Sequence, residues 1–131
     1  MMTKEEHIKY WIDTAQYDWE GTEDAFNAKR YLHCLFWAHL VLEKLAKAHW
    51  VKNHQDNIPP KVHNVVWLLA ELNVDLGADT MDFLEGFNKF QLSGRYPDYM
   101  NNIYKICTKE ITSDNLKKVK EIRQCLIEML Q

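Results

Sequence analysis

The sequence predicts an all-α protein, an up-and-down four- to five-helix bundle that forms a single domain over residues 1–131. Three observations predict it. Only four Gly and three Pro occur in 131 residues, too few for a chain of short strands and tight turns. Apolar residues recur three or four positions apart along several segments. Short connections join these segments, which favours antiparallel neighbours.

The first predicted helix covers roughly residues 4–27. Its apolar stripe consists of Ile8, Trp11, Ile12, Ala15, Trp19, Thr22 and Phe26. The opposite face is acidic, because the first 26 residues contain two lysines and seven carboxylates. The simplest interpretation of this charge is a solvated outer face.

The second predicted helix, about residues 30–53, is the most apolar stretch of the chain, and its apolar residues occupy more than one face. Such a helix is buried between neighbours or by a second subunit, so we expect it to be central. Pro59 and Pro60 then interrupt the pattern, since a proline pair disfavours helix at and before itself.

Asn64 is a suitable N-cap for a third helix that ends before Gly77. A cap at Asp79 or Thr80 opens a fourth helical stretch, which stops at Ser93. The path from residue 95 to residue 111 stays open between a helical turn and extended chain.

The last predicted helix begins at a cap on Thr112 or Ser113 and runs to Leu130. Its inward stripe consists of Leu116, Val119, Ile122, Leu126 and Met129 or Leu130. Residues 103–123 contain six cationic and three acidic side chains, so this end of the chain is basic where the first helix is acidic.

Charge and cysteine content exclude several classes of protein. A formal charge of -3 argues against a general polyanion binder, and no DNA partner is predicted. Three widely spaced cysteines without C-x-x-C spacing signal neither a disulfide framework nor a zinc knuckle, which fits a reducing cytoplasm. No leader-like start and no apolar run of about 18 residues occurs, so we expect a cytoplasmic protein without a membrane segment.

Familiar enzyme and cofactor motifs are absent from the sequence. It contains no nucleophile elbow, no phosphate-cradling glycine loop and no H-E-x-x-H, so no cofactor is predicted. His33 and His39 are six apart and lie on different faces of a helix. His39 and Glu43 are four residues apart and could bind one metal ion together. The Glu-x-x-His pairs of di-metal bundles are missing, however, so no metal site is predicted.

Polar residues stand where packing would favour apolar ones. Glu43 and Lys44 interrupt the buried second helix, and a buried carboxylate is costly unless a cation pairs with it. Arg95 is one candidate for that cation. Three interpretations remain open. Glu43 and Arg95 form a structural ion pair, or Glu43 simply emerges at the edge of the bundle. Alternatively, the two residues mark a polar pocket in which the Arg95 guanidinium binds phosphate.

Seven residues are therefore candidates for a site. The expected phosphate or nucleotide ligands are Arg95, Lys44, Tyr96 and Asp98, and the expected polar pocket behind them consists of Glu43, His39 and His63. Two of the histidines also have ordinary structural interpretations. His39 is typical of a hydrogen-bonded core histidine beside Leu35 and Leu42, and His63 of a residue that supports the start of the third helix.

Three motifs in order resemble the HEPN family, and the resemblance covers about residues 10–129. They are LFWAHLVLEKLAKA at residues 35–48, PPKVHN at 59–64 and GRYPD at 94–98. The resemblance implies a helical bundle that forms a homodimer, often encoded beside a small nucleotidyltransferase with which it makes a toxin-antitoxin or related complex.

Some members of that family are metal-independent endoribonucleases. The resemblance implies that their active site pairs an Arg, here Arg95, with a His four to six residues later, contributed by both subunits across a dimer groove. Residues 100–102 are Met, Asn and Asn, and no histidine follows His63, so the required His is absent. Loss of general acid-base help costs a factor of about 100 to 10,000 in rate.

Three functions therefore remain open. The first is a dimeric binding module that engages a nucleotide or a nucleotidyltransferase partner. The second is an endoribonuclease that uses Arg95 with an unconventional base, and the third is a purely structural dimer. The missing His weighs against the enzyme, and the negative charge weighs against unassisted RNA binding. Five Trp and six Tyr exceed what so small a core needs and favour a protein interface.

Overall fold

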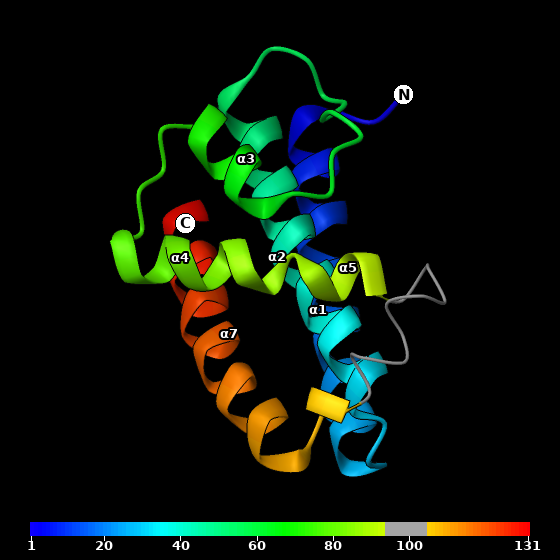
Figure 1. Cartoon of the computed structure of the whole chain (residues 1–131). Helices are drawn as coiled ribbons and strands as arrows, with labels where there is room; N and C mark the ends of the chain where they lie inside the picture. The colour runs from blue at the N-terminus through cyan, green and yellow to red at the C-terminus, as the bar shows by residue number, and fades with distance from the viewer. Residues whose placement is uncertain (94–104) are drawn as a thin grey trace.

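A computed structural model describes residues 1–93 and 105–131, and these residues form an all-α fold (Figure 1). Three long helices make the body of the molecule: α1 (Lys4–Asn27), α2 (Tyr31–Asn53) and α7 (Lys109–Leu130). The shorter helices α3 (Val65–Glu71), α4 (Ala78–Phe87) and α5 (Lys89–Ser93) lie against one side of α2. No strand occurs in the described part of the chain, which confirms the predicted fold class.

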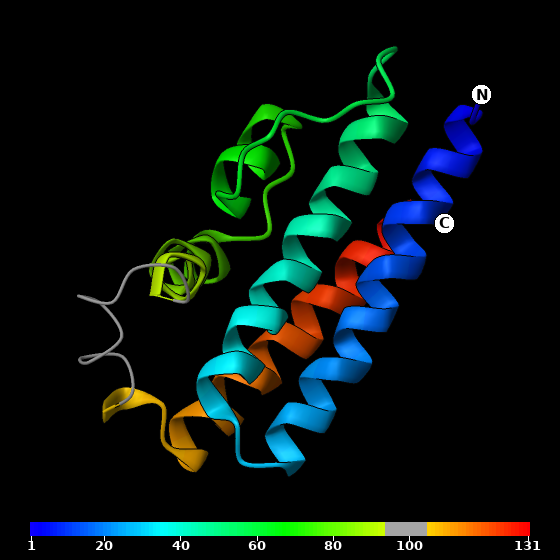
Figure 2. The same cartoon turned by 90° about the vertical axis from the view of Figure 1, so that its right-hand side faces the viewer.

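α1 begins as the sequence predicts. Thr3 caps it by accepting a hydrogen bond from the backbone N–H of Glu6, and the Glu6 side chain accepts in return from the N–H of Thr3. The helix ends in a tight turn in which Lys29 has a left-handed φ of 62°. This turn sends α2 back antiparallel to α1, and the two helices lie side by side over their whole length (Figure 2).

α2 is the central helix, as predicted. Fourteen of its 23 residues are buried. α1 covers one of its sides, α7 a second, and α3 and α5 a third, so little of its circumference meets water (Figure 2). Leu35, Leu42 and Leu45 are at most 1% exposed. Polar side chains in the middle of this helix, such as His39 and Glu43, are therefore buried among protein atoms.

The far end of α2 is tied to the start of α1. The Lys4 ammonium donates to the carbonyl oxygens of Val51 (2.8 Å) and His54 (2.6 Å) and to Oδ1 of Asn57 (2.8 Å). The last carbonyls of a helix lack partners within the helix, and a cation complements the negative end of its dipole. Lys4 thus stabilises the C-terminus of α2.

The Asn64 cap of α3 is confirmed, because its side chain accepts the N–H of Trp67 at 3.1 Å. The predicted cap of the fourth stretch at Asp79 or Thr80 is wrong by two or three residues: α4 begins at Ala78, and its N-cap is Gly77 with a φ of 96°. The stretch is also divided at Asn88, whose side chain bonds to other elements, so α4 and α5 are separate.

The predicted cap of the last helix at Thr112 or Ser113 is also wrong. α7 starts at Lys109, because the Thr108 hydroxyl accepts the backbone N–H of Ile111 at 3.2 Å. Thr112 is fully buried one turn inside the helix. Of the segment that the sequence left open, residues 105–111 are described, and residues 95–104 lie outside the described residues.

Candidate functional site

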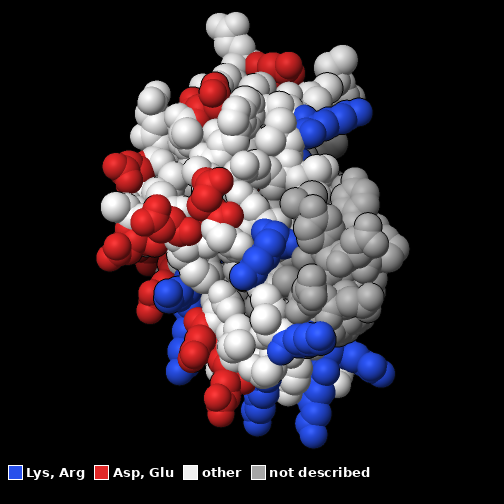
Figure 3. Space-filling view, in the orientation of Figure 1, with Lys and Arg blue, Asp and Glu red and all other residues white. Residues whose placement is uncertain are grey.

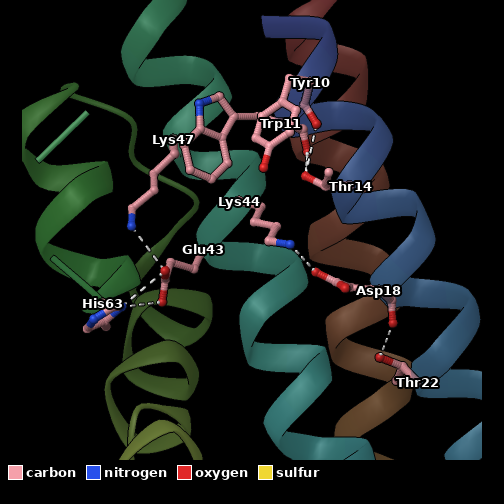
Figure 4. Close-up of polar contacts among 9 residues, drawn as sticks. All are labelled: Tyr10, Trp11, Thr14, Asp18, Thr22, Glu43, Lys44, Lys47 and His63. Atoms are coloured by element: carbon pink, nitrogen blue, oxygen red, sulfur yellow. Dashed lines mark hydrogen bonds and ion pairs between the residues drawn. The ribbon is translucent and has the colours of Figure 1, made fainter. Parts of the chain in front are cut away.

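The polar centre of the molecule is the Glu43 carboxylate on α2. Its side chain is 5% exposed and has two polar partners (Figure 4). Lys47 Nζ lies 3.1 Å from Oε2, and His63 Nδ1 lies 3.1 Å from Oε1 and 3.2 Å from Oε2. We call these three residues the Glu43 cluster. The prediction that Glu43 finds a cation is confirmed.

Lys47 is the nearer partner in sequence, four residues along the same helix. Its side chain is 8% exposed, and its ammonium lies 5.7 Å from the centre of the Trp11 ring of α1. The ammonium thus sits between a carboxylate and an aromatic face, two environments that favour a cation. Sequence reasoning missed this residue, although Glu and Lys four apart on a helix are a known pairing signal.

His63 reaches Glu43 from the connection between α2 and α3, just after Pro59 and Pro60. Its Nδ1–H donates to the buried carboxylate, while 42% of the side chain is exposed. The two ring nitrogens lie on different edges of an imidazole, so binding at Nδ1 directs Nε2 away from Glu43. The cluster therefore orients a partly exposed imidazole, which can accept or donate one further hydrogen bond.

A second chain of polar contacts, the His39 network, adjoins the cluster. His39 is 2% exposed and donates from Nε2 to Oδ1 of Asn88 at 3.0 Å. Asn88 Nδ2 donates in turn to Oδ1 of Asn64 at 3.0 Å, the oxygen that also caps α3. The network joins α2, α3 and the α4–α5 junction. His39 is thus a hydrogen-bonded core histidine, as its structural interpretation predicts.

Burial lowers the pKa of two histidines, because it disfavours the charged imidazole. The pKa of His39 lies below the ordinary 6.5 chiefly because burial disfavours its charged form, although the hydrogen bond to Asn88 and the nearby Glu43 oppose this effect. The pKa of His49 is lowered for the same main reason. Its Nε2 donates to the backbone oxygen of Leu126 at 2.8 Å and so joins α2 to α7.

These shifts predict a loss of stability in mild acid. Below pH 6.5 the unfolded chain binds more protons at these two histidines than the folded chain does, so the free energy of unfolding should fall as pH drops through 6.5. Each histidine contributes at most about 1.4 kcal/mol per pH unit. Urea unfolding between about pH 7 and about pH 5.5 measures this slope. The slope of stability against pH should be smaller in His39→Gln and in His49→Gln. An unchanged slope in both variants would contradict the assignment of the pH dependence to these two histidines.

Lys44, a fourth predicted site residue, does not join the cluster. Lys44 points to the opposite side of α2, where its ammonium lies 2.6 Å from Oδ2 of Asp18 on α1 (Figure 4). One residue of helix turns a side chain by about 100°, which separates Lys44 from its neighbour Glu43. Arg95, Tyr96 and Asp98 lie outside the described residues, so the structure places Glu43, His39 and His63 together and says nothing of these three.

Neither a metal site nor a membrane-spanning helix is found in the described part of the chain. Within residues 1–93 and 105–131, no three His, Cys, Asp or Glu side chains come close enough to form a metal site. Over the same residues, no helix has the length and apolar content needed to cross a membrane.

Fold and site together define a small all-α domain whose central apolar helix carries a buried ion cluster. This chain belongs to the HEPN family, because the family model for the HEPN domain matches residues 8–130. A search of curated proteins and a search of solved structures found no match.

Proposed function

We propose that this HEPN domain is a binding module that acts as a homodimer and engages a nucleotide or a small nucleotidyltransferase partner, as in toxin-antitoxin systems. The observation that carries the proposal is the His63 imidazole, which a 5% exposed carboxylate orients while 42% of its own side chain stays exposed. A ligand that met a preoriented donor would lose less conformational entropy on binding.

Arg95, Tyr96 and Asp98 supply the rest of the proposed ligand site. They follow the end of α5 in sequence, and α5 packs on α2, the helix that carries Glu43. The planar Arg95 guanidinium matches a phosphate through two parallel hydrogen bonds. Lys44 has a smaller part in this proposal than in the sequence-based prediction, because its ammonium is already paired with Asp18.

Exposed aromatic residues support the homodimer. Tyr10 and Tyr17 are 54% and 76% exposed and stand seven residues apart on one face of α1. Gly21 continues that face, and Trp37 of α2, itself 38% exposed, lies against it. Tyr and Trp are enriched where one protein surface buries another, so this strip is the proposed subunit contact.

Binding is favoured over RNA cleavage because the chain lacks the histidine expected after Arg95. General acid-base catalysis needs a group that titrates near the working pH and reaches the reacting atoms. A purely structural dimer is the less favoured alternative, since it gives no role to the exposed edge of His63.

Thermal unfolding with ATP or GTP at millimolar concentration tests the proposal. At about ten times Kd, either nucleotide should raise Tm by about 3 °C or more, because a ligand that binds only the folded state stabilises it. Arg95→Ala and His63→Gln should reduce the shift, whereas His7→Gln, a half-buried histidine on α1, should not. Light scattering of the same samples should give twice 15.6 kDa. No shift with either nucleotide, together with a mass of 15.6 kDa, would overturn the proposal.

A further inference from the structure

A groove separates α4 from α7. Both helices pack on other parts of the bundle but make few direct contacts with each other. Two cavities, of about 400 and about 150 Å³, lie in this gap and share the lining residues Thr80, Glu121 and Ile122. They therefore form one continuous groove, which runs from Phe83 on α4 to Met129 near the end of α7. We call it the α4–α7 groove.

The floor of the groove is apolar. Leu76 and Phe83 are half-buried, Ile122 is 6% exposed and Met129 is 44% exposed. The Cys125 sulfur lies 4.0 Å from the Met129 sulfur and adds a further soft, weakly polar surface. Covering this floor with another apolar surface is favourable, because it removes apolar area from water.

The walls of the groove are acidic. Asp75, Asp79 and Glu121 line it from both sides, and none of these carboxylates forms an ion pair within the described ranges 1–93 and 105–131. Among the described residues of the lining, Lys118 is the single cation, and it stands at one end with its ammonium 5.1 Å from the centre of the Phe83 ring. Figure 3 shows acidic side chains gathered on the side where α4 lies, whereas Lys and Arg gather mainly toward the lower end.

We propose that the α4–α7 groove binds a basic amphipathic helix of a partner protein. The apolar stripe of that helix would cover Leu76, Ile122 and Met129, and its flanking Lys or Arg side chains would meet the carboxylates on the two walls. An amphipathic helix in a groove between helices is a recurrent mode of recognition. Opposite charges on the two surfaces select the partner and its orientation.

The described surface of this chain indicates that the helix bound in the groove comes from a different protein and not from a second copy of this chain. The outer face of α7 carries cations, but Val119, Ile122 and Leu126 of that helix are buried. Its exposed large apolar residues, Ile111 and Met129, are eighteen residues apart and do not form a continuous stripe. The outer face of α1 exposes Tyr10 and Tyr17, but its charged residues are mainly acidic and would be repelled. Neither helix offers an exposed apolar stripe flanked by cations. This inference does not depend on nucleotide binding at His63.

A model peptide tests the groove on the full chain. The probe is a fluorescent peptide of about 18 residues, about five helical turns, with Leu on one face and Lys elsewhere. Fluorescence anisotropy should show saturable binding that weakens with salt. The same peptide with Glu in place of Lys should not bind, and a peptide of the same composition with Leu scattered around the helix should bind at least about tenfold more weakly.

Charge reversal locates the binding. Asp79→Lys combined with Glu121→Lys should weaken binding of the Lys peptide by about tenfold. Glu20→Lys, which reverses an exposed charge on α1, should change it less than about twofold. Asp79 and Glu121 are exposed, so the variants should fold, and their urea unfolding curves check this.

A thiol footprint gives a second readout. Cys125 is exposed and lines the groove, whereas Cys34 and Cys107 are buried. Bound Lys peptide should therefore slow the reaction of Cys125 with a thiol reagent at least about fivefold. Absence of saturable binding, or binding that neither protects Cys125 nor responds to the double reversal, would overturn the proposal. A double reversal that converts a dimer to a monomer would assign the groove to a second copy and would overturn it as well.

Discussion

Replacing Glu43 by alanine is expected to lower the free energy of unfolding by about 3–5 kcal/mol. The change leaves the Lys47 ammonium, which is 8% exposed, without its carboxylate and enclosed beside the Trp11 ring. Removing one member of a buried pair costs the desolvation of the other. Folded domains are stable by about 5–15 kcal/mol in total, so the loss should be large in urea unfolding.

Two variants distinguish the cost of an unpaired buried charge from the cost of lost contacts. Asp18→Ala removes the carboxylate that faces Lys44, but that lysine side chain is 21% exposed and can be hydrated, so we expect a loss of about 1 kcal/mol or less. Glu43→Leu combined with Lys47→Met should recover at least about half of the Glu43→Ala loss, because no unpaired charge remains. If Glu43→Ala lowered the stability no more than Asp18→Ala does, the Lys47 ammonium would have to be hydrated in the variant, and the expectation of a large loss would be wrong.

Replacing Phe87 by alanine is the second change with a large expected effect, about 3–5 kcal/mol. Phe87 is 2% exposed and lies at the centre of an aromatic group on α4 and α5. The centre of its ring lies 6.0 Å from that of His39, 5.2 Å from that of Phe83 and 5.0 Å from that of Phe90. Its loss leaves a cavity that the surrounding residues can fill only in part.

The same substitution should change the chemistry of the site. With the Phe87 ring removed, water approaches His39, and the pKa of His39 should rise toward 6.5 because its burial is the main cause of the lowered value. Urea unfolding measures the stability, and an NMR titration of the imidazole measures the pKa. Phe83→Ala, at a half-buried ring of the same group, should cost less. Phe87→Leu keeps most of the volume and serves if the alanine variant does not fold.

An unchanged His39 pKa in Phe87→Ala, or in Phe87→Leu if only that variant folds, would contradict this account. It would mean that α4 and α5 do not shield the imidazole. A stability loss in Phe87→Ala no greater than that in Phe83→Ala would show that the two rings are equally exposed to solvent, against the 2% exposure of Phe87.

Much of the fold follows from local patterns in the sequence. The stripe through Ala15, Trp19 and Thr22 predicts the buried face of α1, and the caps at Thr3 and Asn64 follow known preferences. The start of α7 was harder to predict because Thr108 and Thr112 are both suitable caps. Burial of Thr112 in the core decides between them, and no local pattern carries that information.

The candidate site was predictable only in part, for a related reason. The sequence by itself determines that the carboxylate at position 43 lies within the most apolar helical stretch of the chain and therefore needs a cation. Helical spacing also places Lys47 on the same face of α2 as Glu43, and Lys44 on a different one.

Only the tertiary structure decides what covers that face. The connection after α2 folds back so that His63, twenty residues from Glu43, supplies the second partner, and α1 takes Lys44 through Asp18. Local spacing sets the direction of a side chain from its own helix. The neighbour that it meets depends on how separate helices pack, and that packing results from the summed burial of many apolar residues distant in sequence.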